Sequence, residues 1–80
     1  MPQHSVTLLS RQGCCLCDDV RVVLQRVCAE LGATLDERDI ADSPDESARW
    51  ADYVPVTMID GQVHDYWRVR EDRLRAALSS

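Results

Sequence analysis

Three of the four cysteines of this 80-residue chain lie close together, at Cys14, Cys15 and Cys17. Cys14 and Cys17 form a Cys-x-x-Cys pair, a spacing that reversible dithiol–disulfide chemistry uses. In that chemistry one thiolate attacks a foreign disulfide, and the second thiol then releases the substrate from the mixed disulfide. The residue types and their spacing therefore predict redox chemistry at Cys14 and Cys17.

The order of the cysteines assigns a role to each member of the pair. Cys14 is the predicted nucleophile because a helix-like segment follows it, and the free N–H groups at a helix start favour a thiolate. Arg11 adds positive charge nearby. Cys17 is the predicted resolving thiol, since helical residues three positions apart are neighbours. Cys15 points elsewhere, and three roles remain open for it: spectator, alternative resolving thiol, or site of oxidation.

Besides redox chemistry, the cysteines could serve as structural cross-links, as metal ligands or as incidental thiols. Bridges within the cluster would close almost no loop and would stabilise the fold little. Three thiolates in one turn could hold Cu(I), Zn²⁺ or half of a bridging iron–sulfur cluster, so a metal-binding module using Cys14, Cys15 and Cys17 is the alternative function. We assign no metal ligand, because a zinc site takes four ligands. A third alternative is an interaction domain with incidental thiols. Cys28 is expected in the core.

Composition limits the remaining function classes. The net charge of −5 argues against nucleic acid as a partner, because the chain could not neutralise a row of phosphates. It also disfavours an anionic membrane surface, and no apolar run is long enough to span a bilayer. The N-terminal residues lack the features of a secretory signal. We therefore expect a cytoplasmic, monomeric protein whose residues 1–80 form a single domain.

The hydrophobic pattern predicts the elements that hold the cysteines. Apolar residues recur every three or four positions after the cluster, which indicates a helix with one buried face. Asp60-Gly61 predicts a tight hairpin turn, and Ser43, Pro44 and Glu46 predict a helix start with a capping box. The predicted elements are a strand over 6–9, a helix over about 15–31, a strand over 34–40, a helix over 44 to about 53, hairpin strands over 56–59 and 62–67, and a helix over 70–78.

This order, β-α-β-α-β-β-α, predicts an α/β protein with a four-stranded mixed sheet flanked by helices. The first β-α-β unit must pair in parallel, whereas the hairpin must pair antiparallel. On the long helix, Arg26 and Glu30 have the spacing of a surface ion pair. The four aromatic residues are expected to be core or half-buried.

The element order and three motifs resemble the thioredoxin fold and, within it, the small glutaredoxin-like proteins. The motifs are the segment from Arg11 to Asp18, with Gly13-Cys14-Cys15-Leu16-Cys17 at its centre, the Val54-Pro55-Val56 segment, and the Asp60-Gly61 turn. The resemblance implies a cis Pro55 opposite the dithiol. It also implies that the Val54 backbone pairs with an extended substrate.

The resemblance implies a thiol–disulfide oxidoreductase with Cys14 and Cys17 as catalytic residues and Arg11, Val54 and Pro55 as substrate-binding residues. Its partners would be protein disulfides or small thiols, in cell redox homeostasis and electron transport. No tightly bound cofactor is expected, and glutathione or another low-molecular-weight thiol is the candidate electron donor. Glutaredoxins commonly bind glutathione through a Gly-Gly-x-x-Asp element after the last strand, where this chain reads Trp67-Arg68-Val69-Arg70-Glu71-Asp72.

Overall fold

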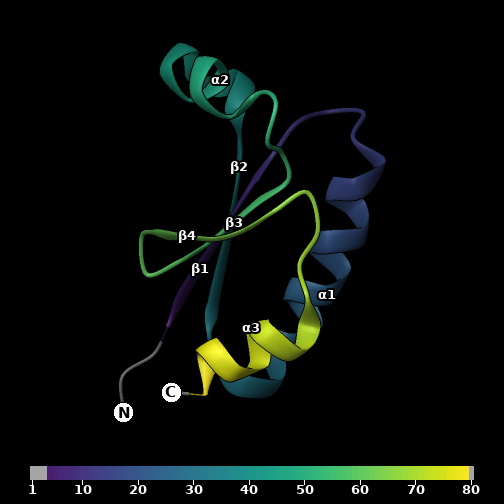
Figure 1. Ribbon diagram of the computed structural model, residues 1–80, viewed down its shortest axis with the longest axis vertical. Coiled ribbons are helices and arrows are strands. Elements are labelled where there is room, and N and C mark those ends of the chain that lie inside the picture. Colours follow the sequence, from purple (N-terminus) through teal and green to yellow (C-terminus); the bar gives the residue numbers. More distant parts are fainter. Residues whose placement is uncertain (1–3, 80) are drawn as a thin grey trace.

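The computed structural model describes residues 4–79 and contains the predicted elements in the predicted order (Figure 1). They are β1 (Ser5–Ser10), α1 (Cys15–Leu31), β2 (Thr34–Asp39), a short 3-10 helix η1 (Ile40–Asp42), α2 (Pro44–Trp50), β3 (Val56–Ile59), β4 (Gln62–Tyr66) and α3 (Glu71–Leu78). The differences are small. The second strand ends before Ile40, which opens η1, and α2 ends at Trp50 instead of near Tyr53.

The four strands form one mixed sheet in the order β2-β1-β3-β4. β1 pairs with β2 in parallel and with β3 antiparallel, while β3 and β4 form the antiparallel hairpin. The central strand β1 therefore has a partner on each side, and it leads directly to the cysteine cluster at the start of α1 (Figure 1). This confirms the predicted thioredoxin-like architecture.

The two faces of the sheet bury different side chains of β1. Val6 and Leu8 point to the face that α1 and α3 cover, whereas Leu9 points to the opposite face near α2, as alternation along a strand requires. The first core cluster comprises Val6, Leu8, Val20, Leu24, Val27, Cys28, Leu74 and Leu78. The second comprises Leu9, Ile40, Val54 and Val56. Both fully buried clusters are built without an aromatic ring.

Local sequence signals account for the element ends. Gly32 ends α1 in the left-handed conformation (φ 72°), and its N–H donates to the Cys28 carbonyl. Asp60 and Gly61 both have positive φ, as the tight hairpin turn requires. Ser43 Oγ accepts the N–H of Glu46 at 3.4 Å. The predicted capping box is nevertheless incomplete, because the Glu46 carboxylate pairs with Arg38 at 3.2 Å.

Arg26 and Glu30 of α1 form ion pairs with α3 instead of with each other. Arg26 pairs with Glu71, and Glu30 pairs with Arg75 at 2.7 Å. The predicted pair between Arg26 and Glu30 is therefore wrong, because α3 packs beside this stretch of α1 and supplies partners for both side chains. Within residues 4–79, the helices are too short or too polar to cross a bilayer.

Candidate active site

Cys14 occupies the N-cap position of α1. Its backbone is extended (φ −95°, ψ 109°), and its Sγ accepts a hydrogen bond from the backbone N–H of Cys17 at 3.3 Å. Gly13 precedes it at φ +76°, in a turn that directs the chain from β1 into the helix. The Cys14 side chain is partly exposed. Its sulfur therefore lies at the positive end of the helix and within reach of an incoming disulfide.

Cys17 lies one turn further along and is buried, with 1% of its surface exposed. Burial, followed by a hydrogen bond with the Cys14 side chain, raises the pKa of Cys17 to about 11. A hydrogen bond from the Arg11 backbone and the charge of Arg21 oppose this shift without cancelling it. Cys17 is thus a neutral thiol at neutral pH, held beside Cys14 and shielded from solvent.

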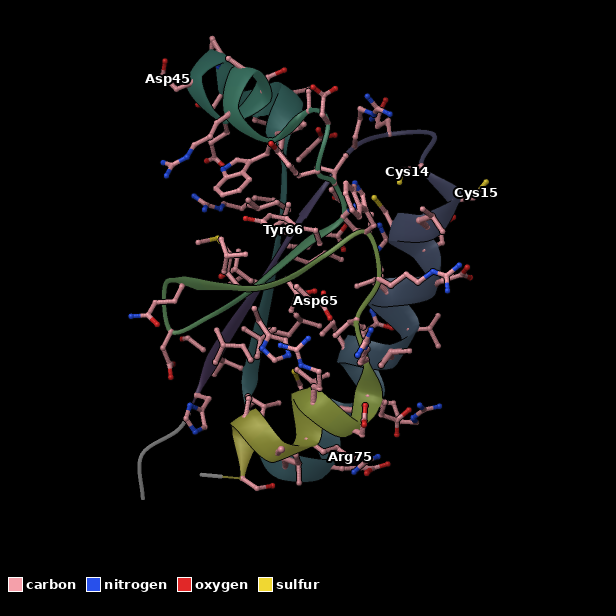
Figure 2. The ribbon with its side chains drawn as sticks, viewed as in Figure 1. Cys14, Cys15, Asp45, Asp65, Tyr66 and Arg75 are labelled. Carbon is pink, nitrogen blue, oxygen red and sulfur yellow. The ribbon has the colours of Figure 1, made fainter. Side chains whose placement is uncertain are left out.

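The other two cysteines lie apart from this pair. Cys15 is exposed, and Figure 2 shows its sulfur directed away from the helix into solvent. Cys28 lies on the buried face of α1 in the core, as predicted, and burial raises the pKa of its thiol. Within residues 4–79, no three His, Cys, Asp or Glu side chains gather as a metal site would need. The geometry therefore gives no support to the metal-binding alternative.

A polar network fixes the first turns of α1 against the sheet. Arg21 donates from Nε and an Nη atom to both carboxylate oxygens of Glu37 on β2, each at 2.6 Å, and from its other Nη atom to Asp18 at 2.6 Å. Ser10 at the end of β1 also donates to Glu37, at 2.9 Å. These bonds lower the pKa of the Glu37 carboxyl below its usual value. Because Arg21 lies one turn beyond Cys17, the network fixes the helix that carries both thiols.

The segment predicted to bind substrate lies at the same end of the sheet (Figure 1). The Val54–Pro55 peptide bond is cis, as the resemblance implied. Both side chains are buried, and the Val54 N–H donates to the Trp50 carbonyl at 3.1 Å. That N–H is therefore already engaged within the protein. The Arg11 side chain is exposed and lines a shallow polar pocket with Ser10 and Glu37.

All four aromatic residues of the chain gather beside this segment. Tyr53 and Tyr66 have ring centroids 5.1 Å apart, and Trp67 stacks on Tyr53 at 6.4 Å with an interplanar angle of 22°. Trp50 completes the cluster, and Figure 2 labels Tyr66 within it. Trp50 is partly buried, and Tyr53, Tyr66 and Trp67 are 43%, 39% and 52% exposed, so the aromatic residues are half-buried instead of forming the core.

Trp67 also borders a groove that extends along α1 to its first turn. The groove has a volume of about 240 Å³, and Leu16, which lies between Cys14 and Cys17, forms part of its lining. Neither side chain was among the residues predicted to bind substrate. The available signal was the departure from Gly-Gly after the last strand, where a bulky Trp67 stands instead.

Solved structures with similar folds include thioredoxins. A Fasciola hepatica thioredoxin superposes with a TM-score of 0.64 and 17% identity, covering 96% of this chain and 79% of that chain. Protein Ne2328 from Nitrosomonas europaea superposes with a TM-score of 0.84 and 19% identity, covering 98% of this chain and 94% of that chain. Target protein XcR50 from X. campestris superposes with a TM-score of 0.75 and 27% identity, covering 92% of this chain and 95% of that chain. The protein thus has a thioredoxin fold.

The sequence comparison is more specific. The family profile described as "Glutaredoxin-like domain (DUF836)" matches residues 5–79. The uncharacterized protein Rv0508 of Mycobacterium tuberculosis is 40% identical over 85 residues, which cover 99% of this chain and 87% of that protein. The chain therefore belongs to the glutaredoxin-like domain (DUF836) family, and its fold and family support a redox-type function.

Proposed function

We propose that this protein is a thiol–disulfide oxidoreductase in which Cys14 attacks and Cys17 resolves. The observation that carries the proposal is the asymmetry of the pair. Cys14 is accessible and caps a helix, whereas Cys17 is buried next to it as a neutral thiol. An attacking thiol needs access and a stabilised anion, while a resolving thiol needs only to reach its neighbour.

The proposed reaction has two exchanges. The Cys14 thiolate attacks one sulfur of a substrate disulfide, forms a mixed disulfide and expels the other sulfur as a thiolate. Cys17 then loses its proton and attacks Cys14 Sγ, so that the Cys14–Cys17 disulfide forms and the second substrate sulfur leaves as a thiolate. The substrate gains two electrons, and two protons complete its dithiol. A dithiol, or two molecules of a low-molecular-weight thiol such as glutathione, would reduce the protein again.

The substrates we propose are protein disulfides or mixed disulfides with small thiols. The exposed Arg11 and the Val54–Pro55 segment at the same end of the sheet would contact them, with the Val54 carbonyl as the backbone acceptor. We further propose that the protein acts as a monomer in the cytoplasm, where reducing thiols are abundant. Neither nucleic acid nor membrane is a proposed partner.

A single-turnover experiment tests this function without an external reductant. Reduced protein is mixed with a disulfide-linked peptide and quenched with acid, and mass spectrometry follows the products. We expect one peptide disulfide to be reduced for each Cys14–Cys17 disulfide that forms. Cys14→Ser should abolish the reaction, while Cys17→Ser should stop it at a mixed disulfide on Cys14.

Cys15→Ser and Cys28→Ser are the matched controls, and both should support the full reaction. Full reduction by the Cys14→Ser variant would disprove the assigned nucleophile. Failure of the unsubstituted protein to form the Cys14–Cys17 disulfide would favour the interaction-domain alternative with incidental thiols.

A further inference from the structure

Trp67 has a backbone conformation that its residue type disfavours. Its φ is +62°, in the left-handed region that residues with a Cβ rarely adopt. Two hydrogen bonds hold it there: its N–H donates to the Pro55 carbonyl at 2.8 Å, and its indole Nε1–H donates to the Asp52 carbonyl at 3.0 Å. Strained residues that the surrounding structure fixes are found frequently at ligand-binding sites.

The fixed Trp67 is nevertheless about half exposed to solvent. Trp67 is 52% exposed and Leu16 is 44% exposed, and the two line the same groove with Val20, Val23 and Val69. Its charged lining residues are Asp19 and Arg68, and neither forms an ion pair within residues 4–79. The groove is therefore mainly apolar with one charge of each sign, and through Leu16 it includes the turn between Cys14 and Cys17.

We infer that Trp67, together with Leu16, determines substrate specificity by holding an aromatic or aliphatic side chain next to the substrate cysteine. The substrate class is thus a protein segment with a large apolar residue beside its disulfide-bonded cysteine. This inference rests on the proposed function, because the groove selects which disulfides reach Cys14. A rigid, pre-positioned indole suits such a role, since it loses little conformational freedom on binding.

Charge favours a protein segment over a small charged thiol as the occupant. The opposite charges of Asp19 and Arg68 balance, so they match a neutral extended peptide better than a ligand with excess charge. The remaining lining is apolar and can desolvate a ring or an aliphatic side chain. A glutathione disulfide carries several exposed charges and offers no such side chain.

The test compares single-turnover rate constants for two disulfide-linked peptides that differ only at the residue beside cysteine, tryptophan in one and glycine in the other. We expect the reduced protein to prefer the tryptophan peptide by about tenfold, the scale of one well-placed aromatic contact. Trp67→Ala should bring the ratio close to one, and Leu16→Ala should lower it several-fold. Leu31→Ala, at an exposed leucine near the far end of α1, should leave the ratio unchanged.

Three other results would contradict the inference, and each has its own explanation. Equal rates for the two peptides, or a preference that survives in Trp67→Ala, would disprove the specificity role and leave the proposed function standing. No reduction of either peptide or of glutathione disulfide would disprove both. A dimer that Trp67→Ala dissociates, measured by sedimentation, would assign the groove to a second copy instead. If circular dichroism shows that Trp67→Ala is unfolded, Leu16→Ala decides.

Discussion

The backbone N–H of Cys17 donates a hydrogen bond to the sulfur of Cys14, although the two side chains have opposite access to solvent. One thiol faces an incoming reagent while the other is buried directly beside it. A single turn of α1 thus gives one thiol access to solvent and buries the other.

Alkylation of the reduced protein should reflect this difference. At neutral pH, iodoacetamide should modify Cys14 and Cys15 and leave Cys17 and Cys28 unmodified, because burial raises the pKa of both inner thiols. Modification of Cys17 should increase as the pH approaches about 11. Peptide mapping by mass spectrometry measures each site, and the guanidine-unfolded protein, in which all four should react, is the control. Rapid labelling of Cys17 in the native protein would contradict its burial.

Gly13→Ala should destabilise the protein by about 1 kcal/mol, because alanine resists the positive φ of this turn. A Cβ at this position would meet no atom within 4 Å, so steric overlap contributes nothing to the cost. Urea unfolding measures the free energy of unfolding. Gly13→Asn should cost less, since asparagine tolerates the left-handed region better. Equal costs for the two substitutions would argue against a conformational cause.

Glu37→Gln should lower the free energy of unfolding at neutral pH, and this effect should shrink in acid. The pKa of Glu37 is lowered in the folded state, mainly by its bonds to Arg21. Its contribution is therefore present above the unfolded value of 4.5 and is lost as the pH falls through the lower folded value.

Urea unfolding at neutral pH and at the lowest pH at which the protein stays folded should show a stability difference between the two proteins of about 1 kcal/mol or less at neutral pH, which shrinks as the pH falls. Asp36→Asn, at an exposed neighbouring carboxylate outside the Arg21 network, is the matched control. It should change stability by no more than about 0.5 kcal/mol at either pH. A Glu37→Gln difference that persists in acid would contradict the electrostatic explanation.

Leu24→Ala should lower the free energy of unfolding by about 2–5 kcal/mol. Leu24, on α1, is fully buried against the sheet and α3, and the truncation leaves a cavity. Val22→Ala on the same helix, at a residue 60% exposed, should change the free energy of unfolding by no more than about 0.5 kcal/mol. Similar effects of the two substitutions would mean that α1 packs through a different face.

Sequence patterns predicted the fold where local signals determine the structure. The stripe of apolar residues gave the bounds of α1, Cys15–Leu31, and Asp60-Gly61 gave the hairpin. Prediction failed where the partner is distant in sequence. Arg26 has Glu30 at ideal spacing, yet it pairs with Glu71 because α3 packs beside α1. Spacing along a helix cannot reveal that competition.

The candidate site was predictable in the same uneven way. The positions of Cys14 and Cys17 follow from their own helix, and the family resemblance located Pro55. The groove between Leu16 and Trp67 does not follow from either source, because it forms only when the segment after β4 lies beside α1. Aromatic residues in a small domain usually enter the core, whereas here aliphatic side chains and cysteines fill it.

The cap that Cys14 provides to α1 links secondary structure to oxidation state. A thiolate sulfur accepts an N–H bond more strongly than a disulfide sulfur, so the Cys17 amide forms its strongest bond when Cys14 is reduced and ionised. The peptide dipoles of α1 would then favour the reduced form of Cys14. Each oxidation would weaken the hydrogen bond that caps the first turn of α1, and each reduction would strengthen it.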